Sequence, residues 1–330
     1  MKKFINAVDQ VENEMIQGMV KAFPQYVKKL DCGNVVVRTQ KKEGKVALIS
    51  GGGSGHEPAH GGYVGRGMLD AAVAGAVFTS PTPDQVYEGI KAVATDAGVL
   101  MVIKNYTGDV MNFEMAGEMA EAEGIKVAQV VVNDDVAVQD STWTVGRRGV
   151  AGTVFVHKIA GALAETGASL EEVQAMAQRV IDNVRTMGAA ISPCTIPAAG
   201  KPGFELGENE MEVGIGIHGE PGTYREKMMS ANGITDVIMD KILADLDYSG
   251  SEVAVMVNSS GATPQMELFI INNHVADVLA AKGIKVYKTF VGEYMTSIEM
   301  EGMSISVLKL DDEMKKLLDA QADTPAFKTL

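Results

Sequence analysis

The feature that most constrains the fold is an alternation between short apolar runs and segments with helical periodicity. Residues 45–50, 98–104 and 126–133 are rich in Val, Ile and Leu and are typical of buried strands. Between them, residues 84–95 and 111–124 place apolar side chains at helical spacing. This alternation predicts an α/β fold with a mostly parallel sheet covered by helices, because parallel strands are joined by crossover connections.

The composition of the chain changes near residue 190. Residues 186–209 hold three of the ten prolines, and proline blocks regular helix. We therefore expect an N-terminal α/β domain over 1–190 and a second, smaller mixed α/β domain over 191–330, which the length of 330 residues can accommodate. In the second domain we expect strands at 211–218, 252–257, 285–291 and 304–310, and helices at 264–283 and 311–321. The stretch 224–246 is also expected to contain helix, interrupted at Gly233.

Composition and charge exclude several classes of function. The 43 acidic residues outnumber the 29 Lys and Arg, which gives a net charge of −14 and disfavours binding to nucleic acid or to anionic membranes. Only Cys32 and Cys194 are present, so no disulfide framework is expected. The absence of a signal-peptide pattern and of a long apolar run predicts a cytoplasmic protein.

The strongest local motif is the glycine-rich segment SGGGSGHEP at residues 50–58. It follows a predicted strand, where open α/β sheets present their ligands, and its glycines let backbone N–H groups approach a ligand closely. The spacing matches neither the Walker loop nor the dinucleotide fingerprint. His56 and Glu57 are thus candidate site residues, although a tight turn with a surface histidine is the alternative.

Two further motifs also end predicted strands. Lys104 and Asp109 lie in KNYTGD, and parallel neighbouring strands would bring them beside the glycine-rich segment; a polar turn that caps the next helix is the alternative. His218 lies in GIGIHGEPG, where the flanking glycines permit close approach. His157 and His274 fall in helical patterns and are expected to be structural, whereas His60 could support His56.

Other catalytic patterns are missing from the sequence. No H-E-x-x-H or similar spacing of zinc ligands occurs, so we expect no metal site. No G-x-S-x-G elbow occurs, and neither cysteine has a histidine nearby in the sequence, which disfavours hydrolases. Arg147 and Arg148 precede a predicted helix and could bind a phosphate or an acidic partner, or could lie in a solvated loop.

Taken together, these motifs resemble the dihydroxyacetone kinase family over essentially the whole chain. The matching segments occur in the family's order: ISGGGSGHEPAHGGYVGRGMLDAAVAGAVFTSPTPDQ, KNYTGDVMNFEMA, NDDVAV, GRRGVAGTVFVHKIAGA and EVGIGIHGEPG. The resemblance implies two α/β domains, a homodimer and dihydroxyacetone as substrate. It also implies a role in glycerol metabolism.

The resemblance also assigns roles to individual residues. It implies that the His218 imidazole adds to the ketone of dihydroxyacetone to form a covalent hemiaminal. His56 would be the acid/base histidine, and Asp109 would activate the substrate hydroxyl. The remaining positions that it assigns to substrate binding are Gly53, Ser54, Gly55, Lys104 and, near the substrate, Ser80.

The source of the phosphoryl group follows from the same resemblance. Family members that use ATP directly carry a further nucleotide-binding helical domain, and this sequence has neither that domain nor a Walker motif. We therefore expect the substrate-binding subunit of the bacterial phosphotransferase-dependent kinase, with no cofactor on this chain. ADP or ATP with Mg²⁺ would lie on a partner subunit that is recharged ultimately from phosphoenolpyruvate.

Two alternatives remain open at this stage. Some relatives bind dihydroxyacetone as sensors or co-activators of a transcription regulator and retain the covalent histidine, so His218 does not separate them from the enzyme. The complete pair of His56 and Asp109 favours the enzyme. The second alternative is a phosphate- or sugar-binding α/β module without catalysis, which leaves His218 unexplained.

Overall fold

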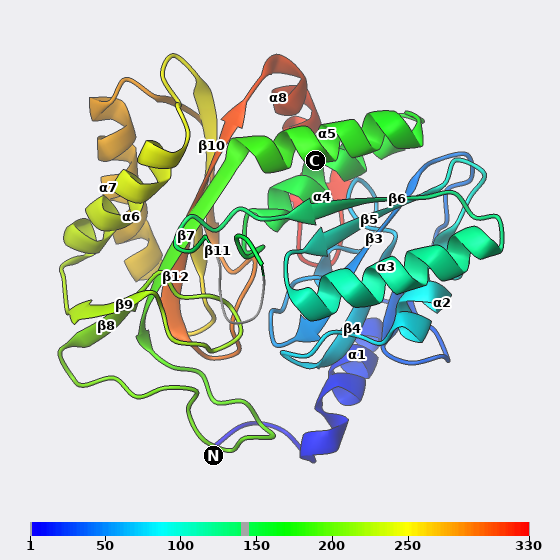
Figure 1. The fold of residues 1–330 in the computed structure, drawn as a ribbon, viewed down its shortest axis with the longest axis horizontal. Helices are drawn as coiled ribbons and strands as arrows, with labels where there is room; N and C mark the ends of the chain where they lie inside the picture. The colour runs from blue at the N-terminus through cyan, green and yellow to red at the C-terminus, as the bar shows by residue number, and fades with distance from the viewer. Residues whose placement is uncertain (1, 140–144, 330) are drawn as a thin grey trace. The chain divides into compact units, whose positions relative to one another are not determined.

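The structure, a computed structural model, describes residues 2–139 and 145–329. They form two compact units, each assembled from separate stretches of chain (Figure 1). The glycine-loop unit contains residues 2–132, 154–180 and 314–329. The His218 unit contains residues 133–139, 145–153 and 181–313.

The glycine-loop unit is built on a six-stranded sheet whose order is β1-β2-β4-β3-β5-β6. The four strands β4, β3, β5 and β6 are parallel, and β1 and β2 extend the sheet in antiparallel pairings. The strands are β1 (Val27–Lys29), β2 (Val35–Arg38), β3 (Ala47–Ser54), β4 (Ala71–Val77), β5 (Val99–Lys104) and β6 (Val127–Val132).

Helices in this unit cover the apolar strands. The core joins Ile49, Val73 and Met101 of the sheet to Ile90 and Phe113 of two of these helices, and all five are buried. The helices are α1 (Val11–Ala22), α2 (Pro83–Val93), α3 (Thr107–Ala122) and α4 (Thr153–Glu165). Two of the passages of the chain between the units fall within helices, namely α5 (Leu170–Asn183) and α8 (Asp312–Asp319). A short antiparallel pair of strands, β13 (Ala322–Asp323) and β14 (Lys328–Thr329), follows α8.

The His218 unit contains a mixed sheet of order β11-β10-β12-β7-β8-β9, in which only β10 and β11 are parallel. Its strands are β7 (Val184–Ser192), β8 (Glu210–Val213), β9 (Tyr224–Lys227), β10 (Glu252–Ser259), β11 (Lys285–Gly292) and β12 (Glu301–Leu310). Helices α6 (Ala231–Asp245) and α7 (Gln265–Ala281) pack their apolar side chains into its core.

The predicted fold class is confirmed: one sheet is mostly parallel and the other is mixed. The predicted division at residue 190 falls inside β7, and the separate stretches of each unit follow from no local sequence signal. Among the residues that the structure describes, no helix is both long enough and apolar enough to cross a bilayer.

Two predicted elements are wrong in part. The stretch 224–246 contains a helix as expected, but α6 is continuous from Ala231 to Asp245, so the predicted interruption at Gly233 is wrong, and Tyr224–Lys227 pairs with β8 as an edge strand. The strand expected over 211–218 ends at Val213, because Gly214 has a φ of +73° and turns the chain out of the sheet. His218 therefore lies on an irregular turn after the strand.

Candidate functional site

The glycine-rich segment begins inside β3 and continues beyond its carboxyl end. β3 pairs in parallel with β5, with Ser50 opposite Val102, so Lys104 at the end of β5 comes close to the glycines as predicted. Gly52 has a φ of +148°, and a Cβ there would lie 2.5 Å from Lys104 Nζ and 3.2 Å from Asp109 Oδ2. Glycine is required at this position to admit both side chains.

Asp109 lies at the centre of a buried polar cluster. Its Oδ1 accepts a hydrogen bond from Ser80 Oγ at 2.5 Å, and its Oδ2 accepts one from Lys104 Nζ at 3.3 Å. The Lys104 and Asp109 side chains are 0% and 3% exposed. Asp109 also lies in the first turn of α3, where the positive end of the helix dipole favours a carboxylate. The cluster thus holds an oriented carboxylate with two donors.

His56 is fully buried just after β3 and stacks on Phe78, with ring centroids 5.2 Å apart. Phe78 follows β4 and adopts a φ of +56°, which is uncommon for a side chain of this size. The role of Phe78 was not predicted, because no sequence pattern indicates an aromatic ring in this backbone conformation. The stacking restricts the orientation of the His56 imidazole.

The other predicted substrate-binding residues lie at the end of β3 and directly after it. Gly53 is buried in β3, and Ser54 Oγ donates to the Gly75 carbonyl at 2.7 Å, which ties β3 to β4. The Gly55 N–H donates to the Glu57 carboxylate at 3.0 Å. Seven of the eight predicted site residues thus lie in the glycine-loop unit, and only His218 lies in the other.

Two further histidines, His60 and His157, form a buried pair beside Ser50 of the glycine strand β3. Nδ1 of His60 and Nε2 of His157 are 3.0 Å apart, and Ser50 Oγ lies 3.3 Å from the same Nδ1. Burial lowers the pKa of His157 to about 3 and lowers the pKa of His60 well below its ordinary value, and the charge of Lys104 adds to both shifts. Both imidazoles are therefore neutral, consistent with the structural role predicted for His157.

We predict that this pair makes the protein sensitive to acid. The unfolded histidine takes up a proton near pH 6.5, but folded His157 does so only near pH 3, so its stabilising contribution is present above pH 6.5 and is lost as the pH falls toward 3. The free energy of unfolding should fall by about 1.4 kcal/mol per pH unit for each such histidine. Denaturant unfolding of the wild type and of His157→Asn between pH 6.5 and 5 should give a shallower slope for the variant; equal slopes would contradict the neutral pair.

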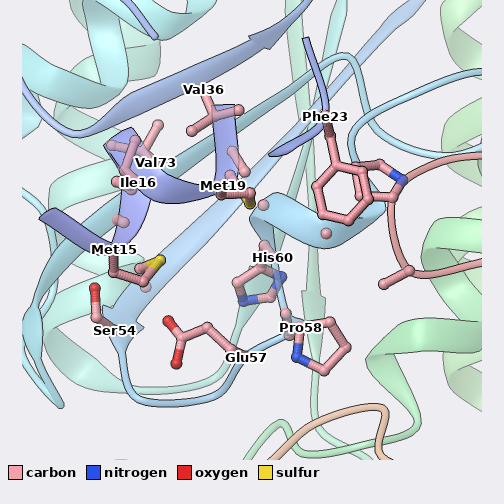
Figure 2. A pocket seen from close by; sticks show the side chains of 18 of the residues that line it. Met15, Ile16, Met19, Phe23, Val36, Ser54, Glu57, Pro58, His60 and Val73 are labelled. Carbon is pink, nitrogen blue, oxygen red and sulfur yellow. The ribbon is translucent and has the colours of Figure 1, made fainter. Parts of the chain in front are cut away.

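A cavity of about 310 Å³ lies on the α1 side of the glycine strand (Figure 2). Its walls include Met15, Ile16 and Met19 of α1, Phe23 directly after α1, and the segment 52–54 of the strand. We did not predict α1, although the apolar side chains at 15, 16, 19 and 23 have helical spacing. This apolar wall bounds the glycine strand on one side.

His218 lies five residues beyond the end of β8. The N–H of Gly214 donates to the Gly188 carbonyl at 2.8 Å, and the N–H of Thr223 donates to the Val213 carbonyl at 2.8 Å, which closes a turn around the histidine. The side chain of His218 is partly exposed. The turn thus presents a histidine on a backbone that is anchored at both ends.

Comparison with known proteins places this chain in a family. A model of the Dak1 domain matches residues 17–326. The chain belongs to the Dak1 family. It is 58% identical, over 99% of its length and 100% of the relative, to the PTS-dependent dihydroxyacetone kinase 1, dihydroxyacetone-binding subunit DhaK, of Listeria innocua. It is 43% identical, over 99% of both chains, to the PEP-dependent dihydroxyacetone kinase, dihydroxyacetone-binding subunit DhaK, of Escherichia coli.

Solved Dak1-like structures have the same fold. The dihydroxyacetone kinase from C. freundii, in complex with AMP-PNP and Mg²⁺, has a TM-score of 0.93 and 36% identity; the match covers 99% of this chain and 61% of that one. The dihydroxyacetone kinase operon co-activator Dha-DhaQ has a TM-score of 0.89 and 37% identity, covering 95% and 97%. The Dak1 fold therefore occurs both in a dihydroxyacetone kinase and in an operon co-activator.

Within residues 2–139 and 145–329, no group of three or more His, Cys, Asp or Glu side chains is arranged to hold a metal ion.

The two adjacent arginines of the sequence motif have partners within this chain. Arg147 pairs with Asp245 at 2.6 and 2.8 Å, and Arg148 is buried. Both predicted alternatives, a phosphate or partner site and a solvated loop, are therefore wrong for Arg148, whose guanidinium is buried and bound within this chain.

Proposed function

We propose that this chain is the dihydroxyacetone-binding subunit of a dihydroxyacetone kinase. The observation that carries the proposal is the buried cluster of Lys104, Asp109 and Ser80 against the glycine strand, in a chain that resembles proteins of that name over its whole length. The cluster presents an oriented carboxylate where a small polyol could be held. Phosphoryl transfer to a hydroxyl requires such an alignment and a group that takes the proton.

The proposal assigns the first chemical step to His218. The lone pair of its neutral imidazole adds to the carbonyl carbon of dihydroxyacetone, so that a C–N bond forms while the C=O π bond breaks. The carbonyl oxygen gains a proton and the imidazole loses its N–H proton, which leaves a neutral hemiaminal. This link selects short carbonyl compounds over glycerol, which has no carbonyl group.

The second step concerns the terminal hydroxyl. We assign Asp109 as the group that accepts the hydroxyl proton during phosphoryl transfer, with His56 as its acid/base partner. Lys104 and Ser80 keep Asp109 oriented through their hydrogen bonds. The backbone of Gly53, Ser54 and Gly55 would bind the substrate, because glycines allow N–H groups to approach it closely.

The phosphoryl donor in this proposal is a separate subunit. It would carry ADP or ATP with Mg²⁺ and be recharged by phosphotransferase proteins. In support, the relative from Listeria innocua is named as PTS-dependent and the relative from Escherichia coli as PEP-dependent. The test is to mix this chain with such a subunit and its recharging proteins and to measure dihydroxyacetone phosphate. Failure to form it with any donor would refute the kinase function.

The same proposal predicts that this chain alone binds no ATP tightly. Its glycine strand lacks the lysine-containing loop that cradles a nucleotide triphosphate. Titration calorimetry with Mg²⁺–ATP, at protein concentrations that detect micromolar affinity, should give no saturable heat. The mixture with the nucleotide subunit provides the positive control, and a micromolar site on this chain would refute the assignment of the donor to a partner.

A second candidate function is a dihydroxyacetone-sensing co-activator. It is favoured by the similarity to the operon co-activator, which extends over 95% of this chain. The kinase assignment accounts better for the cluster around Asp109, because sensing alone needs no proton acceptor. Product formation in the reconstituted mixture separates the two functions. A homodimer and a cytoplasmic location remain predictions, and light scattering would test the first.

A further inference from the structure

Arg148 is a buried charged side chain of the His218 unit with several partners. It is 2% exposed. Its Nε donates to Asp135 Oδ2 at 2.7 Å, and its Nη2 lies 2.6 Å from the same oxygen. Nη2 also donates to the Gly214 carbonyl at 2.8 Å, and Nη1 donates to Glu220 Oε1 at 3.2 Å. The guanidinium thus contacts both sides of the turn that carries His218.

Glu220 extends this connection to the histidine itself. While Oε1 accepts from Arg148, Oε2 accepts the backbone N–H of His218 at 2.9 Å. Each carboxylate oxygen therefore has one partner. An unbroken series of hydrogen bonds leads from Asp135 through Arg148 and Glu220 to the backbone of the histidine.

The turn is shaped to admit these two side chains. A Cβ at Gly216 would lie 1.9 Å from Glu220 Oε1 and 2.8 Å from Arg148 Nη1. Only glycine leaves room for the ion pair directly beneath the backbone that precedes His218. Glycine at position 216 thus allows the buried Arg148 to pair with Glu220.

Asp135, which binds the Arg148 guanidinium, is itself held by a backbone hydrogen bond. The N–H of Ala137 donates to Asp135 Oδ1 at 2.9 Å, so both Asp135 oxygens are occupied. The neighbouring Asp134 accepts the N–H groups of Val150 and Gly152, each at 2.8 Å, and so fixes the backbone on the far side of Arg148. The guanidinium is therefore held before any substrate arrives.

We propose that Arg148 and Glu220 are positioning residues that fix the backbone of His218 so that its imidazole can add to a carbonyl carbon. This inference rests on the proposed function, in which His218 binds dihydroxyacetone covalently. It adds that reactivity depends on the Arg148–Glu220 ion pair as well as on the histidine. Addition requires near-attack geometry, and a displacement of about 1 Å can reduce reactivity about 100-fold.

The test uses variants that keep charge or shape. Arg148→Lys keeps the positive charge but replaces the planar fork by a single ammonium group, which cannot reproduce contacts to Asp135, Gly214 and Glu220 together. Glu220→Gln keeps the shape but turns one acceptor into a donor. Intact-mass spectra at a series of times after mixing with dihydroxyacetone measure the rate of loading. We expect this rate to fall about 10- to 100-fold in each variant.

The matched control is Arg147→Lys. Arg147 is the adjacent residue and pairs with Asp245 of the same unit, so this variant breaks a comparable ion pair away from the His218 turn. It should load like the wild type. The rate of phosphoryl transfer per loaded chain should stay within a few-fold of the wild type in Arg148→Lys and Glu220→Gln. Loss of folded protein would instead lower the maximal fraction of loaded chains without slowing the loading of the folded remainder.

The outcomes distinguish this inference from the proposed function. Circular dichroism establishes that each variant is folded, and if Arg148→Lys is not, Glu220→Gln provides the measurement, because its side chain is partly exposed. Wild-type loading by both variants would overturn the positioning role alone. Absence of an adduct in the wild type would overturn the covalent function and, with it, this inference.

Discussion

Replacement of His218 by alanine is expected to abolish the covalent adduct with dihydroxyacetone. No other described histidine lies on a partly exposed turn beyond a strand end: His56, His60 and His157 are buried, and His274 lies in α7 and contacts Asp236 at 2.7 Å. The wild type should gain the mass of one dihydroxyacetone molecule, and His218→Ala should gain none. Intact-mass spectrometry under native conditions is the measurement, because borohydride does not trap a hemiaminal.

His274→Ala is the control for this experiment. It removes a histidine from the same unit without altering the turn after β8, so it should load fully. An adduct that persists in His218→Ala would move the covalent role to another residue, and peptide mapping would locate it.

Asp109→Asn is expected to bind dihydroxyacetone but to lose most of its phosphoryl-transfer activity. Asparagine keeps the size of the side chain and part of its hydrogen bonding to Ser80 and Lys104, yet it does not accept the hydroxyl proton. Removal of a general base typically lowers the rate by about 100- to 10,000-fold. Formation of dihydroxyacetone phosphate in the reconstituted mixture measures the rate, and mass spectrometry verifies that substrate is bound.

The exposed Asp96 of the same unit supplies a control, since Asp96→Asn should leave the rate unchanged. His56→Asn should resemble Asp109→Asn, and the double variant should lose much less than the product of the two losses if both residues serve one proton transfer. Near-full turnover of Asp109→Asn would make Asp109 a positioning residue and leave His56 as the base.

The cluster in the glycine-loop unit was predictable because its members follow the ends of adjacent parallel strands. Lys104 and the glycines of β3 meet for that reason, and the apolar run of β5 identifies the strand. The edge strands were harder to predict. β1 has three residues, and the four residues of β9 are all exposed, so neither shows an apolar pattern that separates strand from helix or loop.

The hydrogen bonds of Arg148 and Glu220 that hold the His218 turn were not predictable from local sequence. Arg148 is 72 residues from Glu220 and 13 from Asp135, and an arginine pair before a helix is equally typical of a solvated loop. Phe78 poses the same problem, because its contact with His56 depends on a positive φ that its neighbours do not indicate. Side chains that orient others are specified by tertiary packing.

The discontinuous chain of the glycine-loop unit has a consequence for biosynthesis. Lys158 is fully buried and donates to the Leu317 carbonyl at 2.6 Å, and Tyr26 donates to Asp323 at 2.8 Å, although these partners are separated by 159 and 297 residues. Domains usually begin to fold from the N-terminus while the ribosome is still elongating the chain. Here the first 180 residues leave the ribosome without the segment that completes their unit. The N-terminal segments of this unit therefore acquire these contacts only after residues 314–329 have been synthesised.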